Sequence, residues 1–415
     1  MRWITGKLSD LVEINPPIKL VKGKEYPFVS MDVINPGKKI VEAKEYRNFS
    51  GGGARFQNND TLFARITPCL ENGKIAQVRN LDGGVGFGST EFLVFRGKKG
   101  ITDTEFVHYF VTNHSFRAKA IQLMVGTSGR QRVDHKKLSE EEFTIPPLSI
   151  QRKIAEILGS LDDKIELNRR MNETLEQMAM ALYKHWFVDF GPFQDGEFVE
   201  TELGLIPKGW TIQQLSDLVT IQTSSVNPAK NEERLFLHYS IPAYDERMLP
   251  VLEQGLEIKS NKYLIRKNSV LVSKLNPETY RIWTVYAESS QYERICSTEF
   301  IVYEPKKEIA WAFLNAYFRD ESFKNEFRSH AAGTTGSRQR VTPRKTLEFK
   351  LVVPPDSILE QFNDMCSDYF KIQSKNIKEN EMLTEIRDYL LPRLLSGEIE
   401  VGEAEEQVEE VLANA

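Results

Sequence analysis

The stretch GTSGRQRV at residues 126–133 returns as GTTGSRQRV at residues 333–341, with one inserted residue. Two further segments recur at an offset of about 208 residues, namely LSDLV at 8–12 and again at 215–219, and STEF at 89–92 and again at 297–300. The repeat is far longer than a solenoid unit of roughly 20 to 50 residues, so each copy can form a domain with a connecting element. The sequence therefore predicts a dimer-like, two-fold object within one polypeptide, suited to a two-part target.

A long helical pattern lies between the two copies. It opens after Pro146-Pro147-Leu148-Ser149, with Ser149 as the expected N-cap, and runs to about Phe187. Apolar and amide residues alternate along it at steps of four and three, as in a coiled-coil seam: Ile154, Leu158, Leu161, Ile165, Asn168, Asn172, Leu175, Ala179, Leu182 and Trp186. The second copy repeats the pattern and is expected to end at Leu391-Pro392, with seam residues Phe362, Cys366, Tyr369, Gln373, Asn376, Asn380, Leu383 and Leu390. Each helix would be roughly 55 Å long, and the simplest expectation is that the two pack on each other.

Two asparagines occupy matching seam positions near the middle of each helix. If the helices run antiparallel about a pseudo-two-fold axis, Asn168 lies opposite Asn380 and Asn172 lies opposite Asn376. Buried amide pairs would lower stability but favour this register, because a slipped register leaves amides against Leu or Ile without partners. The alternative is that these positions face solvent or a partner protein.

Candidate DNA contacts are loops that combine basic and amide residues with Gly, Ser or Thr. Arg side chains can bond guanine in bidentate fashion, amides can bond adenine, and hydroxyl groups can bond phosphates. The best candidate is the repeated loop, with contacts expected from Thr127, Ser128, Arg130, Gln131 and Arg132 in the first copy and Thr334, Thr335, Ser337, Arg338, Gln339 and Arg340 in the second. A single loop of this kind is most simply interpreted as a solvated basic turn before a strand. Because the loop is duplicated, we favour a role in DNA contact.

A second pair of candidate loops follows an apolar strand in each copy and contains a proline turn. The expected contacts are Arg65, Thr67, Asn72 and Lys74 in the first copy and Lys274, Asn276, Tyr280 and Arg281 in the second. The strand residues match between copies while the polar tips differ. We infer that the two domains read different DNA sequences.

Composition and charge narrow the class of protein. Hydrophobic residues make up 40% and charged residues 27%, which suits a soluble globular chain with two cores. No apolar signal region or membrane span is apparent and the three cysteines are scattered, so a reducing cytoplasm is expected. Residues 1–150 carry 22 basic against 16 acidic residues, which permits nucleic-acid binding, whereas residues 397–415 carry seven Glu and no Lys or Arg and are expected to be a solvated, frayed tail.

Two functions from other classes compete with DNA recognition. An enzyme would need a catalytic constellation in each repeat, and the repeated positions share no carboxylate pair, nucleophile–base pair or metal cluster. The six histidines show no paired metal spacing, so no catalytic or metal site is predicted. A coiled-coil adaptor without DNA readout would keep the helices but would not need duplicated Arg-Gln-Arg loops.

Three junction segments resemble one known family, the specificity subunits of type I restriction-modification systems. They are ALYKHWFVDF at residues 181–190, GLIPKGW at 204–210 and RDYLLPRLLSGE at 387–398. The resemblance covers essentially the whole chain except the acidic end after about Gly402. It implies a mixed α/β (α+β) fold in which two repeated target recognition domains are held apart by two long antiparallel coiled-coil helices. The implied domains are 1–147 (first recognition domain), 148–190 (central helical spacer), 191–355 (second recognition domain, with linker 191–206), 356–396 (C-terminal helical spacer) and 397–415 (acidic tail).

The resemblance also implies a function and a set of partners. The chain itself would be non-catalytic and hold no cofactor, and each domain would read a few base pairs of a bipartite, asymmetric site in double-stranded DNA. Two methylation subunits would bind S-adenosylmethionine and methylate adenine, while restriction subunits would use ATP and Mg²⁺ for translocation and cleavage. Half-sites would then be spaced by about one helical turn, roughly 34 Å, or somewhat more.

Overall fold

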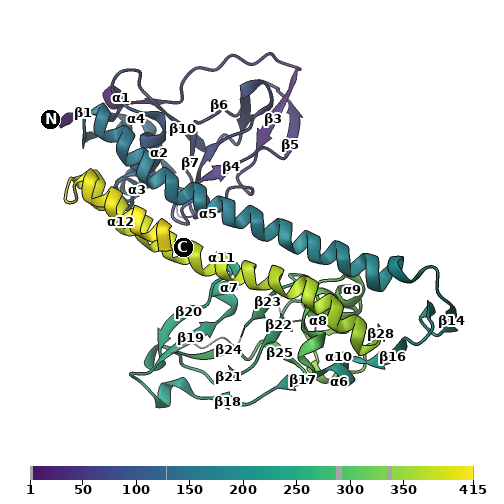
Figure 1. Ribbon diagram of the computed structural model, residues 1–415. Coiled ribbons are helices and arrows are strands. Elements are labelled where there is room, and N and C mark those ends of the chain that lie inside the picture. The colour runs from purple at the N-terminus through teal and green to yellow at the C-terminus, as the bar shows by residue number, and fades with distance from the viewer. Residues whose placement is uncertain (1–2, 128, 287–291, 334–338, 415) are drawn as a thin grey trace. The chain divides into compact units, whose positions relative to one another are not determined.

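The computed structural model describes residues 3–127, 129–286, 292–333 and 339–414. The chain divides into two compact units. Unit 1 contains residues Met1–Glu166 and Met382–Ala415, and unit 2 contains Leu167–Glu381. Each unit therefore combines a mixed α/β domain with a stretch of both long helices, which are labelled α5 and α11 in Figure 1.

Unit 1 is built around two sheets. Its five-stranded sheet has the order β2-β10-β7-β8-β4, with β2 (Val12–Ile14), β10 (Phe92–Gly97), β7 (Thr61–Ala64), β8 (Ile75–Val78) and β4 (Ile40–Val41). Its four-stranded sheet has the order β5-β3-β9-β6, with β5 (Glu45–Asn48), β3 (Glu25–Val29), β9 (Val85–Gly88) and β6 (Ala54–Gln57). Two antiparallel ladders complete it, one of β1 (Ile4–Lys7) with β13 (Glu142–Ile145) and one of β11 (Met124–Val125) with β12 (Arg132–Val133). All four residues of β7 and of β8 are buried, so neither strand shows the alternation of buried and exposed residues that a half-exposed strand has, and the polar Thr61 and Gln77 are buried as well.

Helices cover one face of the larger sheet of unit 1. They are α1 (Leu8–Leu11), α2 (Thr104–Thr112), α3 (His114–Gln122) and α4 (His135–Glu140). Asp103 caps α2 by accepting a hydrogen bond from the backbone N–H of Phe106. The main core joins Phe63 and Phe95 of the sheet to Phe106 of α2 and to Leu158 and Leu161 of α5. The domain thus shares one hydrophobic core with the helices.

Unit 2 repeats this plan with different strand lengths. Its four-stranded sheet has the order β17-β25-β22-β23, with β17 (Val219–Gln222), β25 (Phe300–Pro305), β22 (Ser269–Ser273) and β23 (Ile282–Val285). Its five-stranded sheet has the order β18-β21-β24-β19-β20, with β18 (Ser225–Val226), β21 (Lys262–Ile265), β24 (Glu293–Ser297), β19 (Leu235–Tyr239) and β20 (Val251–Gln254). The two-stranded ladders are β14 (Phe198–Thr201) with β15 (Gly204–Pro207), β16 (Thr211–Gln214) with β28 (Lys350–Val353), and β26 (Ala331–Ala332) with β27 (Arg340–Val341).

The short helices of unit 2 follow the same order as those of unit 1. They are α6 (Leu215–Leu218), α7 (Ile241–Arg247), α8 (Trp311–Tyr317), α9 (Glu321–Ser329) and α10 (Pro343–Thr346), of which α7 has no helical counterpart in unit 1. The order β2-β10-β7-β8 corresponds strand by strand to β17-β25-β22-β23. The two internal copies predicted from the recurring segments, and the mixed α/β fold that the family resemblance implies, are therefore confirmed.

The two long helices are α5 (Leu148–Tyr183), which continues as a π-helical turn over Lys184–Val188, and α11 (Asp356–Ser396). Helix α5 begins at Leu148, so the prediction of Ser149 as its N-cap is wrong. Helix α11 does not end at Leu391-Pro392 as expected, because it contains Pro392 and runs one turn further. Leu390 and Leu394 on either side of this proline are buried in the core of unit 1, and this packing offsets the backbone hydrogen bond that proline cannot make. Within the described residues, no helix combines the length and apolarity that a membrane span requires.

The asparagines of the seam lie in unit 2 and hydrogen-bond across the two helices. The Nδ2 of Asn168 donates to Oδ1 of Asn380 at 2.9 Å, and Nδ2 of Asn376 donates to Oδ1 of Asn172 at 2.8 Å. Gln373 adds a third cross-helix bond, from its Nε2 to the backbone carbonyl of Asn172 at 2.8 Å. These are the pairs that an antiparallel alignment predicts.

The acidic C-terminal segment is not a frayed tail. Residues Val401–Asn414 form helix α12, which lies along the helices of unit 1 (Figure 1). Ala404 and Val408 are buried in the core of unit 1, with Val401 and Val411 packed beside them. Their spacing places them on one face of a helix, while the glutamates occupy the other face. The expectation of a solvated tail is wrong, because burial of this apolar face stabilises the helix despite its acidic charge.

Candidate nucleic-acid interface

The two loops singled out in the first copy are joined in the structure. The β11–β12 hairpin carries the repeated loop, and Gln131 within it contacts Thr67 of the proline loop. The backbone N–H of Thr67 donates to the carbonyl of Gln131 at 3.0 Å, and the N–H of Gln131 donates to the Thr67 hydroxyl at 3.0 Å. An isolated β-bridge between Ile66 and Arg132 continues the contact. Segments 64 residues apart in sequence thus form one surface element.

An ion pair holds the base of this hairpin. The guanidinium of Arg132 donates from Nε to both carboxylate oxygens of Glu91 at 2.9 Å and from Nη2 to one of them at 2.6 Å. This hydrogen bonding, and secondarily the carboxylate charge, raises the pKa of Arg132 further above its usual range. The arginine that the sequence suggested as a base reader is therefore engaged in an intramolecular ion pair, with its side chain 43% exposed. Its immediate role is to position the loop.

Unit 2 reproduces the arrangement with its own residues. The backbone N–H of Asn276 donates to the carbonyl of Gln339 at 2.9 Å, and Leu275 forms a β-bridge with Arg340. Arg340 pairs with Glu299, with Nε at 3.0 Å from a carboxylate oxygen. Thus the repeated STEF and RQRV segments interact with each other in both copies.

The glutamates of these pairs are positioning residues that the composition of the loops alone does not indicate. Glu91 and Glu299 lie in the repeated STEF segments, whose recurrence marks the duplication. Two segments that recur together at one offset are candidates for mutual contact. That co-recurrence was the available signal.

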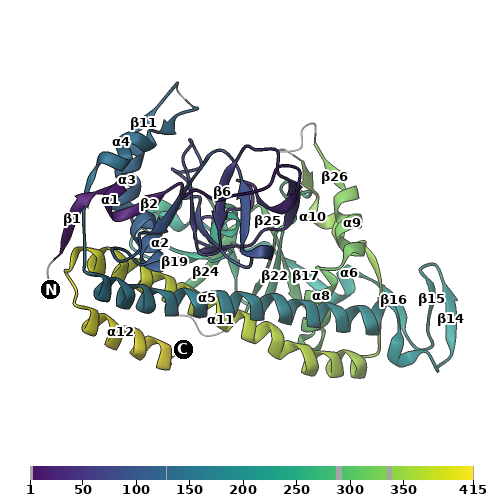
Figure 2. The ribbon, with the colours of Figure 1, turned by 90° about the horizontal axis from the view of Figure 1, so that it is seen from above.

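The tip of the unit 1 hairpin is the part left open to solvent. Thr127, Gly129 and Arg130 are exposed, and the hairpin extends beyond the body of the domain beside the label β11 in Figure 2. Gly126 has φ of +130°, and a Cβ there would lie 3.0 Å from the carbonyl oxygen of Arg130, so this turn requires glycine. Ser128 and, in unit 2, Thr334, Thr335, Ser337 and Arg338 lie outside the described residues.

Two expected contacts of the second proline loop are engaged in the interior. The hydroxyl of Tyr280 donates to the carbonyl of Phe318 at 2.6 Å, and burial raises its pKa well above the usual value. Arg281 makes a bidentate pair with Asp245, at 2.6 and 2.9 Å, and its side chain is only 12% exposed. Tyr280 and Arg281 are therefore structural residues of unit 2, which corrects their assignment as surface contacts.

The other predicted contacts of the proline loops differ in how exposed their side chains are and in whether they already form hydrogen bonds. Lys74 donates from Nζ to the carbonyl of Met31 at 2.9 Å, while Asn72 is exposed. Arg65 is half-buried, and its Nη2 lies 3.5 Å from the carbonyl of Val133. In unit 2, half-buried Lys274 bonds the neighbouring strands through its backbone. Asn72 is accordingly the most accessible of the predicted proline-loop residues in unit 1.

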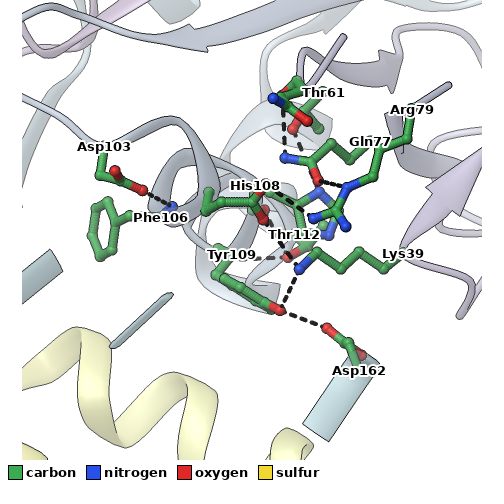
Figure 3. A network of polar contacts seen from close by, with 12 residues as sticks. Lys39, Thr61, Gln77, Arg79, Asp103, Phe106, His108, Tyr109, Thr112 and Asp162 are labelled. Atoms are coloured by element: carbon green, nitrogen blue, oxygen red, sulfur yellow. Dashed lines mark hydrogen bonds and ion pairs between the residues drawn. The ribbon is translucent and has the colours of Figure 1, made fainter. Parts of the chain in front are cut away.

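A buried polar network attaches the unit 1 domain to the helices. Lys39 donates from Nζ to the hydroxyl of Tyr109 at 3.0 Å, and that hydroxyl donates to Oδ2 of Asp162 on α5 at 2.7 Å (Figure 3). The other oxygen of Asp162 accepts from Arg387 of α11 at 2.7 Å. A chain of polar contacts therefore runs from the sheet domain through α2 to both long helices.

Next to this network, His108 lies on α2 with its ring buried. Its Nδ1 is 3.4 Å from the hydroxyl of Thr61. Desolvation, and secondarily the charge of Lys39, lowers the pKa of His108 to about 3. The imidazole is consequently neutral at physiological pH.

Unit 2 attaches its domain to the helices through one arginine. Arg319 donates from Nε to the carboxylate of Glu176 on α5 at 3.1 Å, and from Nη2 to the hydroxyl of Thr284 at 2.9 Å. Its guanidinium also lies over the ring of Phe370 on α11, 5.9 Å from the centroid. A hydrogen bond that involves a charged side chain thus fixes each domain to its own stretch of the helix pair. The contact is made through Asp162 in unit 1 and through Arg319 in unit 2.

Among all the residues that the structure describes, no group of three or more His, Cys, Asp or Glu side chains is arranged to hold a metal ion. What the surface elements offer is a set of hydrogen-bond donors and acceptors on constrained loops. Such groups suit recognition of a polar polymer by contact.

Known proteins of one kind are similar to this chain in sequence. A model of the type I restriction modification DNA specificity domain matches residues 2–177. The specificity subunit of the type I restriction enzyme MjaIX from Methanocaldococcus jannaschii is 31% identical over 280 residues, and the alignment covers 64% of this chain and 62% of that protein. The specificity subunit of the enzyme HindI from Haemophilus influenzae is 26% identical over 413 residues, covering 83% of this chain and 87% of its own.

A solved structure supports the fold. The crystal structure of the type I restriction-modification S subunit from M. genitalium aligns with a TM-score of 0.50 at 16% identity, covering 95% of this chain and 96% of that one. The duplicated domains, the paired helices and the matched sequences agree. The chain is thus similar in sequence to type I restriction-modification specificity subunits, and residues 2–177 match their DNA specificity domain.

Proposed function

We propose that the chain binds double-stranded DNA sequence-specifically as the non-catalytic recognition subunit of a type I restriction-modification complex. It would read a bipartite, asymmetric site, one part with each domain, and direct adenine methylation and restriction by partner subunits. The observation that carries this proposal is the duplicated loop assembly. In each unit a hairpin is tied to a proline loop by the same backbone contact, and to the turn before a central strand by the same Glu–Arg pair.

The chemistry of the hairpin tip supports base reading in unit 1. Arg130 is exposed and, among the described residues, its guanidinium makes no hydrogen bond or ion pair. An unengaged guanidinium can donate two parallel bonds to O6 and N7 of guanine in the major groove. Thr127 and Asn72 supply further exposed polar groups from the hairpin and the proline loop.

The partners follow from the same proposal. Two methylation subunits would supply S-adenosylmethionine and the methyl transfer, and restriction subunits would supply ATP- and Mg²⁺-dependent cleavage. The chain would bind no cofactor of its own. It would act in the cytoplasm, where the DNA is.

The test is to map adenine methylation genome-wide in cells that express the chain with its methylation partner. A two-part methylated motif is expected. Arg130→Ala should relax or abolish one part of the motif, because each bidentate base contact contributes about 1–3 kcal/mol of discrimination. Arg152→Ala, an exposed arginine of the same unit on α5, is the matched control and should leave the motif intact.

If no new motif appears although a stable complex forms, the chain does not read DNA. The adaptor interpretation would then be favoured. Salt dependence gives an independent discrimination, because DNA affinity falls steeply with salt as counterions are released from phosphates.

A further inference from the structure

A pair of adjacent basic residues follows the repeated hairpin in both units. In unit 1, Lys136 and Lys137 lie in the first turn of α4, just after β12. In unit 2, Arg344 and Lys345 occupy the corresponding place in α10, just after β27. The two pairs are 208 residues apart, so they belong to the duplicated pattern, although none of the four was among the predicted contacts.

All four side chains are free to meet an external anion. Lys136, Lys137, Arg344 and Lys345 are exposed. Across the described ranges, none of them makes a side-chain hydrogen bond or ion pair. Figure 2 shows α4 at the base of the projecting hairpin, so the helix that carries the unit 1 pair directly adjoins the proposed base-reading hairpin.

The acidic residues near the unit 1 pair are already engaged. The carboxylate of Asp134 caps α4 by accepting the backbone N–H groups of both lysines, at 3.1 and 3.2 Å. Glu140 pairs with Lys7, and Glu141 pairs with Lys119. In unit 2 the position of Asp134 is taken by uncharged Thr342. Among the residues that the structure describes, neither pair therefore forms an ion pair with a neighbouring carboxylate.

A basic residue can also recur in both copies because the fold needs it, as one lysine in each unit shows. Lys98 and Lys306 also lie 208 residues apart, and each donates from Nζ to a backbone carbonyl of a repeated LSDL helix. The acceptors are the carbonyls of Ser9, at 2.9 Å, and Ser216, at 2.7 Å. Those lysines are explained by the fold. The side chains of the pairs that follow the hairpins have no such partner in the described part of the chain, so their repetition points to an external ligand.

We propose that Lys136–Lys137 and Arg344–Lys345 bind backbone phosphates of the duplex next to the bases that each hairpin reads. This inference rests on the proposed DNA-reading function and assigns a second, sequence-independent class of contact. Phosphate contacts from Lys and Arg fix the position of a protein on the duplex, whereas base contacts specify the sequence. The pairs would thus set each hairpin in the groove before its tip tests the bases.

The test is the salt dependence of binding by the full-length chain to a fluorescently labelled duplex of mixed sequence. The slope of log Kobs against log salt concentration should lose about 0.9 for each phosphate contact removed. We expect K136Q/K137Q and R344Q/K345Q each to reduce the slope by about 1.8, and their combination to reduce it by about 3.6. K136R/K137R, which keeps the charge, should retain the wild-type slope.

The matched control is R152Q/K153Q, an adjacent, exposed basic pair of unit 1 on α5 that removes the same charge. It should leave the slope near that of the wild type. If K136Q/K137Q and R344Q/K345Q change the slope no more than the control does, the phosphate assignment is wrong while DNA reading stands. If the wild-type chain shows no salt-dependent binding at all, the proposed function itself fails, and this inference with it.

Discussion

Replacing Asn168 should loosen the helix pair of unit 2 by a measurable amount. Its side chain is 1% exposed, and its Nδ2 donates to Oδ1 of Asn380 at 2.9 Å. Asn168→Ala removes this donor and leaves the partner amide within the seam with one bond fewer. Loss of one partner of a buried hydrogen bond costs about 1–3 kcal/mol. Local opening of the helix should become more frequent by roughly 5- to 150-fold.

The assay is amide hydrogen exchange along α5 under native conditions, which reports local opening free energies. Gln177→Ala, at an exposed position of the same helix, is the control and should change exchange little. Asn168→Leu combined with Asn380→Leu should restore protection near the wild-type level, because replacing both partners by apolar groups removes the unsatisfied amide. It should also weaken the preference for one register, since a leucine seam no longer distinguishes aligned from slipped helices.

Two results would refute this reasoning. Exchange in Asn168→Ala that matches Gln177→Ala would mean that the amide pair contributes nothing to the helix pair. A double leucine variant as unprotected as the single alanine variant would mean that packing, not hydrogen bonding, dominates at this position. Either result would leave the asparagines without the register role inferred from their spacing.

Three further outcomes follow from buried or paired groups. His108 is protonated near pH 6.5 in the unfolded chain but only near pH 3 in the folded protein, so the free energy of unfolding should fall as pH drops through that window. The fall should be at most about 1.36 kcal/mol per pH unit. Urea titrations at several pH values should show a flatter dependence for His108→Gln than for the wild type. Val408→Asp should detach α12, at a local cost of at least about 2 kcal/mol, because a 14-residue helix is marginally stable without its packing. Limited proteolysis should then cleave rapidly within residues 401–414 and not elsewhere. Cleavage as slow as in the wild type would contradict this prediction. Glu91→Gln should weaken the hold on Arg132 and raise hydrogen exchange in the β11–β12 hairpin, and equal exchange in variant and wild type would show that the pair does not fix the loop.

The periodic features of the fold were predictable from the sequence. Apolar and amide residues from Ile154 to Trp186 recur at steps of four and three, and this period alone predicts a helix that packs on a second helix. The matching positions of the asparagines in the two helices then predict their pairing. The end of α11 could not be predicted, because Pro392 is a strong local stop signal that tertiary packing of Leu394 overrides. Local signals decide helix ends only where burial does not.

The candidate site was predicted in its location but not in its internal contacts. The sequence indicated both loops of unit 1, yet their union through Thr67 and Gln131 depends on strand register between distant segments. Tyr280 was assigned to the surface because it follows a proline turn. Its apolar neighbours Ile282 and Trp283 belong to a strand of the interior, and this alternation was the stronger signal.

The separation between a fixed hairpin base and an open tip bears on how the protein can change over generations. The base depends on Glu91, Arg132 and the backbone bonds to Thr67, so substitutions there disturb the fold of the loop. The tip at Thr127 and Arg130 contributes no described side-chain contact to that base. Mutations at the tip can therefore accumulate at little cost in folding. Under the proposed function, a lineage carrying this scaffold would acquire new DNA targets one half-site at a time, while the other half-site and the proposed partners stay the same.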